Sequence, residues 1–491
     1  MLEIIKIDNG VSRMPEWQLR SPVTFSLLEG EHIAIIGENG SGKTKLIDMI
    51  TGRHPVFPDQ ATYNFPDSTK KLISDNIKYI TFRDSYGSYD RGYYLQQRWN
   101  QQEIDESTPT AGMLLEEAFS YSGQDTADRR KFQRHLYDLF SMDSLLDKYI
   151  ILLSSGEMRK FQLTKMLLSE PRVLIIDNPF IGLDTETRVQ LENLLRTLSE
   201  ERKIQIILVL TKESDIPDFI THVWEMRGEE LKPKIERERF TQTHHTNKVL
   251  DEQKESAIVS LPQKTDDYNT KTVAELKDVS IRYGKRTILK NLNWTVLNGD
   301  HWALSGRNGA GKSTLLSIIC ADNPQSYACN ITLFDNKRGS GETIWEIKKH
   351  IGYVSPEMHR AYNKDIDCIK IVASGLNDSV GLYVKPSEND YDTCRFWMRI
   401  FGIEHLQNRT FMKISSGEQR LILLARAFVK DPELLILDEP LHGLDAKNGQ
   451  RVKEIIDAFC KRKNKTLIMV SHYKEEYPSC INKEITLKRN I

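Results

Sequence analysis

The sequence predicts an α/β fold made of two tandem domains, each built on a largely parallel β-sheet. The first observation is a set of short apolar runs typical of buried parallel strands, separated by segments with helical patterns. These runs cover 33–36, 173–176, 204–210, 302–305, 434–437 and 466–470. The second observation is that four motifs occur twice, in the same order, 261 to 269 residues apart. Solenoid repeats are about 20–50 residues long, so each copy is a whole domain.

The repeated motifs keep their order and nearly their spacing. GENGSGKT at 37–44 returns as GRNGAGKS at 306–313, SSGE follows at 154–157 and 415–418, an apolar run ending in Asp at 173–177 and 434–438, and GLD at 182–184 and 443–445. The distance from the first Ser of SSGE to the Asp is 23 residues in both copies, from Ser154 to Asp177 and from Ser415 to Asp438. We therefore predict an N-terminal domain over 1–228 and a C-terminal domain over 272–491.

The segment between the two copies, 229–271, is polar, and its acidic and basic residues nearly balance. Few large apolar side chains are available there to build a core. We expect an exposed, partly disordered linker with a short helix near its middle. The adjacent pair His244–His245 has no other metal ligand near it in the sequence, which favours a solvated pair over a metal site.

Composition limits the classes of function. The chain has 68 Lys and Arg against 69 Asp and Glu, so its formal net charge of −1 gives no direct sign of a nucleic-acid partner. No apolar stretch approaches the 18 residues of a transmembrane helix, and the N-terminus does not read as a signal peptide, so we expect a cytoplasmic protein. The six cysteines form no CxxC pair and are expected to be free thiols.

The glycine-rich motifs have the G-x-x-x-x-G-K-[ST] pattern of a phosphate-binding loop. Glycines let main-chain N–H groups turn toward phosphates, the following helix N-terminus and Lys add positive charge, and the last hydroxyl reaches Mg²⁺. Both copies follow an apolar strand and precede a helical pattern. The residues predicted to contact nucleotide are Gly37, Asn39, Gly40, Gly42, Lys43 and Thr44 in the first copy, and Gly306, Asn308, Gly309, Gly311, Lys312 and Ser313 in the second.

Two carboxylates are predicted to help hold Mg²⁺. Asp177 and Asp438 each end a buried strand downstream of a phosphate loop. A carboxylate placed beside the loop holds Mg²⁺ directly or through water. We therefore predict metal contacts from Thr44 and Asp177 in the first domain, and from Ser313 and Asp438 in the second.

The order of phosphate loop, S-x-G-[EQ], apolar strand with Asp, and GLD resembles the ATP-binding cassette (ABC) ATPases, twice and over nearly the whole chain. The resemblance implies two P-loop ATPase domains, each with a helical subdomain that carries the signature motif. It implies that ATP and Mg²⁺ bind between the cassettes, where each phosphate loop meets the opposite signature. The signature residues are Ser154 and Gly156 in the first cassette, and Ser415 and Gly417 in the second.

The resemblance also implies that the two sites differ. In the C-terminal site, Glu439 follows Asp438 and would polarise the attacking water, His472 would touch the γ-phosphate, and Tyr283 would stack on adenine. In the N-terminal site, Asn178 replaces Glu439 and Lys212 replaces His472. Met14 occupies the offset of Tyr283, with Trp17 close by. An amide cannot accept a proton as a carboxylate does, so we expect slow turnover in the N-terminal site.

The partner is less defined than the chemistry. RGSGETIWEIKKHIGYVS at 338–355 and LLILDEPLHGLD at 434–445 resemble the two-cassette ModF type, the ATP-binding proteins associated with molybdate transport. This implies an importer ATPase with a separately encoded permease, placed at the inner face of the plasma membrane. Pro356 and Phe82 stand where transporter cassettes carry a glutamine near the permease contact, which weakens that expectation. The alternatives are an ATPase acting on the ribosome or in DNA maintenance.

Overall fold

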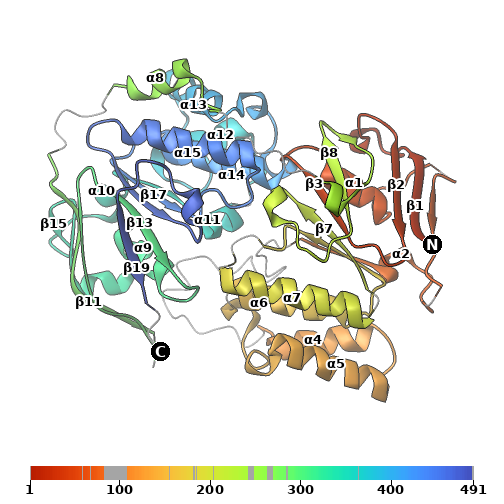
Figure 1. Ribbon diagram of the computed structural model, residues 1–491. Helices are drawn as coiled ribbons and strands as arrows, with labels where there is room; N and C mark the ends of the chain where they lie inside the picture. The colour runs from red at the N-terminus through yellow and green to blue at the C-terminus, as the bar shows by residue number, and fades with distance from the viewer. Residues whose placement is uncertain are drawn as a thin grey trace. The chain divides into compact units, whose positions relative to one another are not determined.

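The computed structural model of the protein describes residues 2–57, 59–66, 68–81, 108–153, 155–180, 183, 185–202, 204–240, 248–262, 269–283, 286–362 and 364–488. The chain forms two compact units (Figure 1). One unit contains the described residues up to 240 and carries the first set of motifs. The other contains the described residues from 248 onward and carries the second set.

The N-terminal unit contains a mostly parallel sheet of strand order β10-β8-β3-β7-β6-β5, with β9 paired to β8, and a small antiparallel sheet of order β2-β1-β4. Its strands are β1 (Glu3–Gly10), β2 (Val23–Leu28), β3 (Ile33–Gly37), β4 (Ala61–Tyr63), β5 (Ile77–Thr81), β6 (Val173–Asp177), β7 (Gln205–Leu210), β8 (His222–Arg227), β9 (Glu230–Leu231) and β10 (Ile235–Glu236). Its helices are α1 (Lys43–Ile50), α2 (Ile73–Asn76), α4 (Ala111–Tyr121), α5 (Ala127–Phe140), α6 (Ser155–Leu167) and α7 (Thr185–Arg202).

The C-terminal unit has a parallel sheet of order β16-β17-β18-β13-β19 and an antiparallel sheet of order β12-β11-β14-β15. Its strands are β11 (Thr272–Tyr283), β12 (Arg286–Leu297), β13 (His301–Gly306), β14 (Asn330–Leu333), β15 (Asn336–Lys337), β16 (Ile351–Val354), β17 (Leu434–Asp438), β18 (Thr466–Val470) and β19 (Lys483–Leu487). Its helices are α8 (Glu252–Val259), α9 (Lys312–Ile319), α10 (Ile344–Lys348), α11 (Pro356–Ala361), α12 (Cys368–Ala373), α13 (Glu388–Ile400), α14 (Ser416–Phe428) and α15 (Ala446–Cys460).

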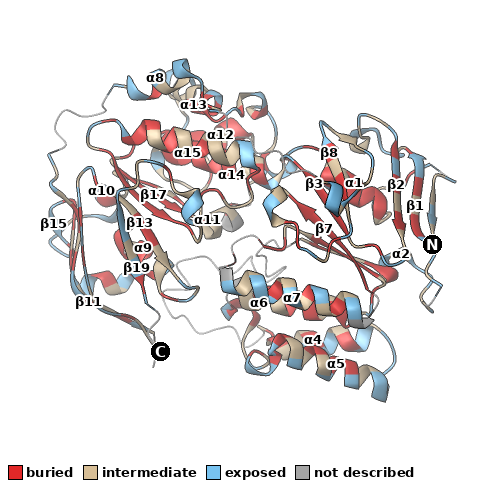
Figure 2. Ribbon diagram, in the orientation of Figure 1, coloured by how far each residue is buried: buried red, intermediate tan, exposed pale blue. Residues whose placement is uncertain are grey.

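The two main sheets have the same topology. The order β5-β6-β7-β3-β8 of the first unit corresponds to β16-β17-β18-β13-β19 of the second, and every neighbouring pair in both series is parallel. Strands β3, β7, β17 and β18 are buried along their whole length (Figure 2), which explains why they read as continuous apolar runs. The predicted α/β fold with two tandem copies is confirmed.

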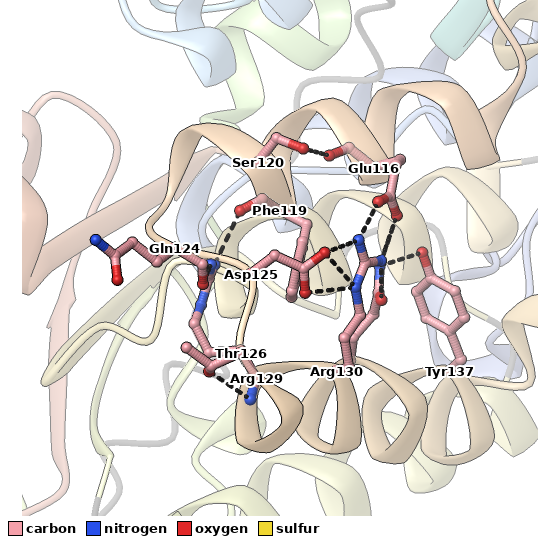
Figure 3. Close-up of polar contacts among 10 residues, drawn as sticks. Glu116, Phe119, Ser120, Gln124, Asp125, Thr126, Arg129, Arg130 and Tyr137 are labelled. Carbon is pink, nitrogen blue, oxygen red and sulfur yellow. Dashed lines mark hydrogen bonds and ion pairs between the residues drawn. The ribbon is translucent and has the colours of Figure 1, made fainter.

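A helical layer in each unit carries the signature helix. In the N-terminal unit, α4 and α5 pack on α6, and an arginine joins them at the surface (Figure 3). The Arg130 guanidinium on α5 lies 2.6 Å from Glu116 Oε1 on α4, and 2.7 Å from Asp125 Oδ2 in the connecting loop. The guanidinium of Arg129 stacks on the Phe119 ring at 4.2 Å and donates to the Phe119 carbonyl. These contacts fix α5 against α4.

The corresponding layer of the C-terminal unit has an aromatic core. Trp397 of α13 is 1% exposed and lies 5.1 Å, ring centroid to centroid, from Phe428 of α14. Phe428 in turn lies 5.0 Å from Phe459 of α15. This core anchors the signature helix α14 to the rest of its unit.

Replacing Trp397 with Ala should destabilise the C-terminal unit by about 3–5 kcal/mol, because a large buried ring is removed and the cavity closes only partly. Urea unfolding followed by circular dichroism will measure the loss. Trp345→Ala is the matched control, since Trp345 is 68% exposed. Equal shifts in the two variants would show that the aromatic core does not stabilise the unit.

The segment predicted as a linker contains short elements on both sides of its undescribed part. β9 and β10 extend the sheet of the N-terminal unit through pairing with β8. Helix α8 packs on α15, and the main-chain N–H groups of Val249 and Leu250 donate to the Glu454 carboxylate. The pair His244–His245 lies outside the described residues. The domain limits drawn from the sequence stay a prediction.

Candidate active site

Both phosphate loops connect a central strand to a helix, as their sequences predict. The loop after β3 leads into α1, and the loop after β13 leads into α9. Gly40 and Gly42 have φ of 77° and 93°, and Gly309 and Gly311 have 77° and 98°, a left-handed backbone that favours glycine. This conformation lets successive main-chain N–H groups of the loop face one anion.

The loop lysines lie over their own loops. Lys43 Nζ donates to the carbonyls of Gly37 at 2.6 Å and Glu38 at 2.9 Å. Lys312 Nζ donates to the carbonyl of Gly306 at 2.6 Å, as Lys43 does to that of Gly37. The next residues, Thr44 and Ser313, are exposed in the first turn of their helices, and Asn39 and Asn308 are half-buried in the loops.

The predicted metal-binding carboxylates lie at the same edge of each sheet as the loops, because parallel strands present their carboxyl ends together. Asp177 is the last residue of β6 and accepts hydrogen bonds from the Tyr79 hydroxyl at 3.1 Å and from Asn178 Nδ2 at 2.8 Å. Asp438 is the last residue of β17 and is buried. Burial and the adjacent Glu439 raise the pKa of Asp438, and the positive charge of Lys312 acts in the opposite direction.

Glu439 lies between two histidines. His472 Nε2 lies 2.9 Å from Glu439 Oε1, and His442 Nδ1 lies 3.1 Å from Glu439 Oε2. Burial opposes ionisation of this carboxyl, but the adjacent imidazoles of His442 and His472 hold the pKa of Glu439 well below its usual range. The structure therefore places a carboxyl group with two neighbouring imidazoles just after β17, and a carboxylate in such a place can accept a proton from water.

His442 was missed by the sequence reasoning. It lies three residues after Glu439, in the turn before GLD. Its sequence position could have pointed to it, because it follows the proposed catalytic carboxylate in the same turn. The other copy has Ile181 at that position, so the histidine is specific to the second copy.

The N-terminal unit repeats the backbone of this site with different side chains. Asn178 and Glu439 both have left-handed backbone, with φ of 49° and 48°, and their N–H groups donate to Val209 and Val470 of the next strand at 2.8 and 2.9 Å. Asn178 Oδ1 accepts from the Thr211 hydroxyl at 3.4 Å. Parallel pairing aligns Asp177 with Val209 and Asp438 with Val470, so Thr211, and not Lys212, stands where His472 stands in the other unit. The predicted replacement of His472 by Lys212 is therefore wrong by one residue. The first copy therefore places an amide where the second places a carboxylate.

The two signature motifs begin helices α6 and α14. Ser415 caps α14: its hydroxyl accepts from the Glu418 N–H, and the Glu418 carboxylate accepts from the Ser415 N–H at 2.8 Å. This reciprocal cap explains the Glu of the second SSGE. Gly417 is buried. At Gly156 in the other signature, an added Cβ would meet no atom within 4 Å. Ser154 and Phe82 lie outside the described residues.

An aromatic side chain lies near each loop helix. The Tyr283 hydroxyl accepts from Asn323 Nδ2 at 2.9 Å, just after α9. His54 has the same offset from Lys43 as Asn323 has from Lys312, and Trp17 stacks on it with ring centroids 4.2 Å apart. Tyr283 contacts Asn323, and Trp17 contacts the equivalent residue, His54, in the other unit. Met14, which has the matching sequence offset, is not the aromatic residue at this place.

The model of the ABC transporter family matches residues 21–181 and 289–442, one match in each unit. The chain belongs to the ABC transporter family. It is 34% identical over 490 residues to the ABC transporter ATP-binding protein ModF of Escherichia coli, covering 97% of this chain and 95% of the relative. It is 29% identical to an uncharacterized ABC transporter ATP-binding protein of Schizosaccharomyces pombe, covering 98% of this chain and 97% of that relative. The resemblance to the ModF type is confirmed.

Two solved ABC structures share the fold at low sequence identity. The archaeal ribosome recycling factor aABCE1, in a complex with the stalk protein aP1, is 16% identical with a TM-score of 0.53, covering 97% of this chain and 87% of that one. The RNase-L inhibitor is 18% identical, also with a TM-score of 0.53, covering 96% and 87%. At these identities the likeness shows the fold alone.

Family membership establishes that this tandem ABC protein binds and hydrolyses ATP. Within the described ranges, each helix is too short or too polar to cross a bilayer.

Proposed function

We propose that this ABC ATPase hydrolyses ATP mainly in its C-terminal cassette and uses that cycle to energise or regulate a molybdate-type importer through a separately encoded membrane permease. It would act in the cytoplasm, at the inner face of the plasma membrane. The observation that best supports the catalytic part is the position of the Glu439 side chain between His442 and His472. The similarity to ModF supports the transport part.

The donor set of each cassette fits Mg²⁺, which prefers oxygen ligands and keeps several waters. Thr44 and Ser313 offer exposed hydroxyls, and Asp177 and Asp438 offer carboxylates at the adjacent strand ends. When bound, Mg²⁺ would neutralise part of the phosphate charge.

The remaining roles follow from the chemistry of the side chains. Lys312 and the N–H groups of its loop would bind the β- and γ-phosphates. Glu439 would accept the proton of the attacking water, and His472 would orient Glu439 and contact the γ-phosphate. Tyr283 would stack on adenine.

The N-terminal cassette would bind ATP with Lys43 and Thr44 and hold it as a clamp. The Asn178 amide donates to Asp177 and has no basic oxygen that could take the proton of water. Slow turnover there would keep the nucleotide bound while the other site cycles.

We further propose that each signature completes the opposite site, so that Ser154 and Gly156 act on the nucleotide bound by Lys312, and Ser415 and Gly417 on the nucleotide bound by Lys43. The N–H groups at the start of a signature helix would meet the γ-phosphate, which the helix dipole favours.

Gly156→Arg tests this crosswise pairing. The space around Gly156 is open within its own unit, so the arginine should leave the N-terminal cassette folded. We expect ATP hydrolysis to fall by about 10-fold or more, because the side chain would block the approach of the signature to phosphate. Steady-state phosphate release will measure the change. Ser120→Arg, on the exposed surface of α4, is the matched control. If both variants hydrolyse ATP like the wild type, crosswise pairing is wrong.

The partner can be tested with the Glu439→Gln variant, which should stay loaded with ATP. Cell extract is mixed with the tagged variant with and without ATP, cross-linked, and separated into membrane and ribosome fractions. An ATP-dependent cross-link to an integral membrane protein of an oxyanion importer would support the proposal. ATP-dependent sedimentation with ribosomes, or retention on DNA, would contradict it and favour the corresponding non-transport function.

A further inference from the structure

Three potential metal ligands from distant parts of the sequence meet in the C-terminal unit. His301 is the first residue of β13, Cys460 is the last residue of α15, and Cys480 lies in the loop before β19. One ligand atom from each residue lies within 4.8 Å of the others. A tetrahedral Zn²⁺ ion, with Zn–S about 2.3 Å and Zn–N about 2.0–2.1 Å, places such atoms about 3.5–3.8 Å apart. The observed cluster can reach that spacing with small side-chain movements.

The His301 ring is held by a carbonyl contact at each of its two nitrogens. Its Nδ1 lies 3.1 Å from the main-chain oxygen of Cys480, and its Nε2 lies 3.2 Å from that of Lys465. A histidine that binds metal through one nitrogen usually donates the other N–H to a carbonyl or carboxylate, which fixes the ring. Both nitrogens face carbonyl oxygens here, so metal binding requires one of them to lose its proton and its carbonyl contact, while the other keeps a carbonyl to receive its N–H.

The carboxylate of Asp457 holds the segment of Cys480 against the helix of Cys460. Asp457, three residues before Cys460 on α15, accepts the Cys480 N–H at 2.8 Å on one carboxylate oxygen, and the Ser479 N–H and hydroxyl on the other. The loop that carries Cys480 is therefore held against the helix that carries Cys460. Cys460 is buried, while Cys480 and His301 are half-buried, so the cluster is shielded but reachable from solvent.

We propose that His301, Cys460 and Cys480 bind one Zn²⁺ ion in the C-terminal cassette, with two thiolates, one imidazole and a water as the fourth ligand. Binding would release one proton from each thiol, so the charge of the two thiolates balances that of the ion. The ion would join β13, α15 and the loop leading to β19, and would thereby stabilise the C-terminal end of the chain on the sheet.

This site is separate from the nucleotide site. His301 begins β13 and Gly306 ends it, and Gly306 is the first residue of the phosphate loop. At about 3.3 Å per residue, the strand places the two sites about 16 Å apart, at opposite ends of the parallel sheet. The ion would therefore act on stability, and ATP chemistry should not require it.

The test uses the full-length protein, reduced and stripped of metal by a chelator, and titrated with Co²⁺. Tetrahedral Co²⁺ with thiolate ligands has visible d–d bands and a near-ultraviolet charge-transfer band, both of which should saturate at one ion per chain. Zn²⁺ should remove these bands by displacing Co²⁺, and should raise the Tm of the protein.

Cys460→Ser and Cys480→Ser should each weaken Co²⁺ binding by about 100-fold and remove the Zn²⁺-dependent rise in Tm. Cys329→Ser, a half-buried cysteine elsewhere in the unit, is the control and should behave like the wild type. ATP binding is measured on every variant as a control for folding. This control does not depend on whether the protein binds metal. The absence of saturating thiolate bands in the reduced protein, or equal bands in all variants, would overturn the proposal. The proposal would also be overturned if the isolated protein contained a stable Cys460–Cys480 disulfide and bound no metal once that bond had been reduced.

Discussion

Glu439→Gln should lower steady-state ATP hydrolysis by about 100-fold or more while leaving ATP bound. The amide keeps the size of the side chain but cannot accept a proton, and general-base catalysis is worth about 10²–10⁴ in rate. The left-handed backbone at this position and the hydrogen bond of its N–H to Val470 do not depend on the carboxylate, so the variant should fold normally. Phosphate release under saturating ATP, together with the amount of ATP retained after rapid desalting, will measure both effects.

Glu433→Gln provides a matched control from the residue before the same strand. Glu433 immediately precedes β17, and its carboxylate pairs with His350 Nδ1 at 3.1 Å, so it is also a half-buried glutamate beside a histidine. It lies at the amino end of the strand, away from the phosphate loop. We expect its turnover to stay within about twofold of the wild type, since the group is not near the reaction. Sustained turnover in Glu439→Gln would remove this residue from the mechanism.

The sequence predicted the parts of the molecule that are encoded in contiguous motifs. A phosphate loop specifies its own conformation, because its glycines adopt left-handed backbone and its lysine folds over the preceding carbonyls, as Lys312 does with Gly306. Continuous apolar runs such as 434–437 predicted buried parallel strands, because a strand that is covered on both faces has no polar side. The fold could therefore be predicted closely from the sequence.

The parts that could not be predicted depend on long-range contacts. The six cysteines are free thiols, as expected, but His301 and Cys460 are far apart in the chain and become neighbours only through the packing of their unit, so the sequence does not show their cluster. The sequence put Met14 at the offset of Tyr283 and Trp17 only close to it, since an offset counted along the chain does not show that Trp17 stacks on His54. In both cases the chemistry is set by packing and not by spacing.

Variants of the two loop lysines can show which of the two cassettes hydrolyses ATP faster. Both donate to the first carbonyl of their own loop at 2.6 Å, so Lys43→Ala and Lys312→Ala remove the same group from the same local geometry. Removing a cation that stabilises phosphate charge in the transition state costs about 10²–10³ in rate where the chemistry occurs. Lys312→Ala should therefore reduce turnover by about 100-fold or more.

Lys43→Ala should instead reduce turnover by less than about 10-fold, because the loss falls on a site where Asn178 already prevents proton transfer. Equilibrium dialysis with labelled ATP should show one nucleotide lost from each variant, which separates weaker binding from slower chemistry. Equal losses of turnover in Lys43→Ala and Lys312→Ala would mean that both cassettes hydrolyse ATP. The Glu439 carboxylate would then not be what distinguishes the two cassettes. A larger loss in Lys43→Ala would reverse the assignment, making the N-terminal cassette the site of hydrolysis despite its amide.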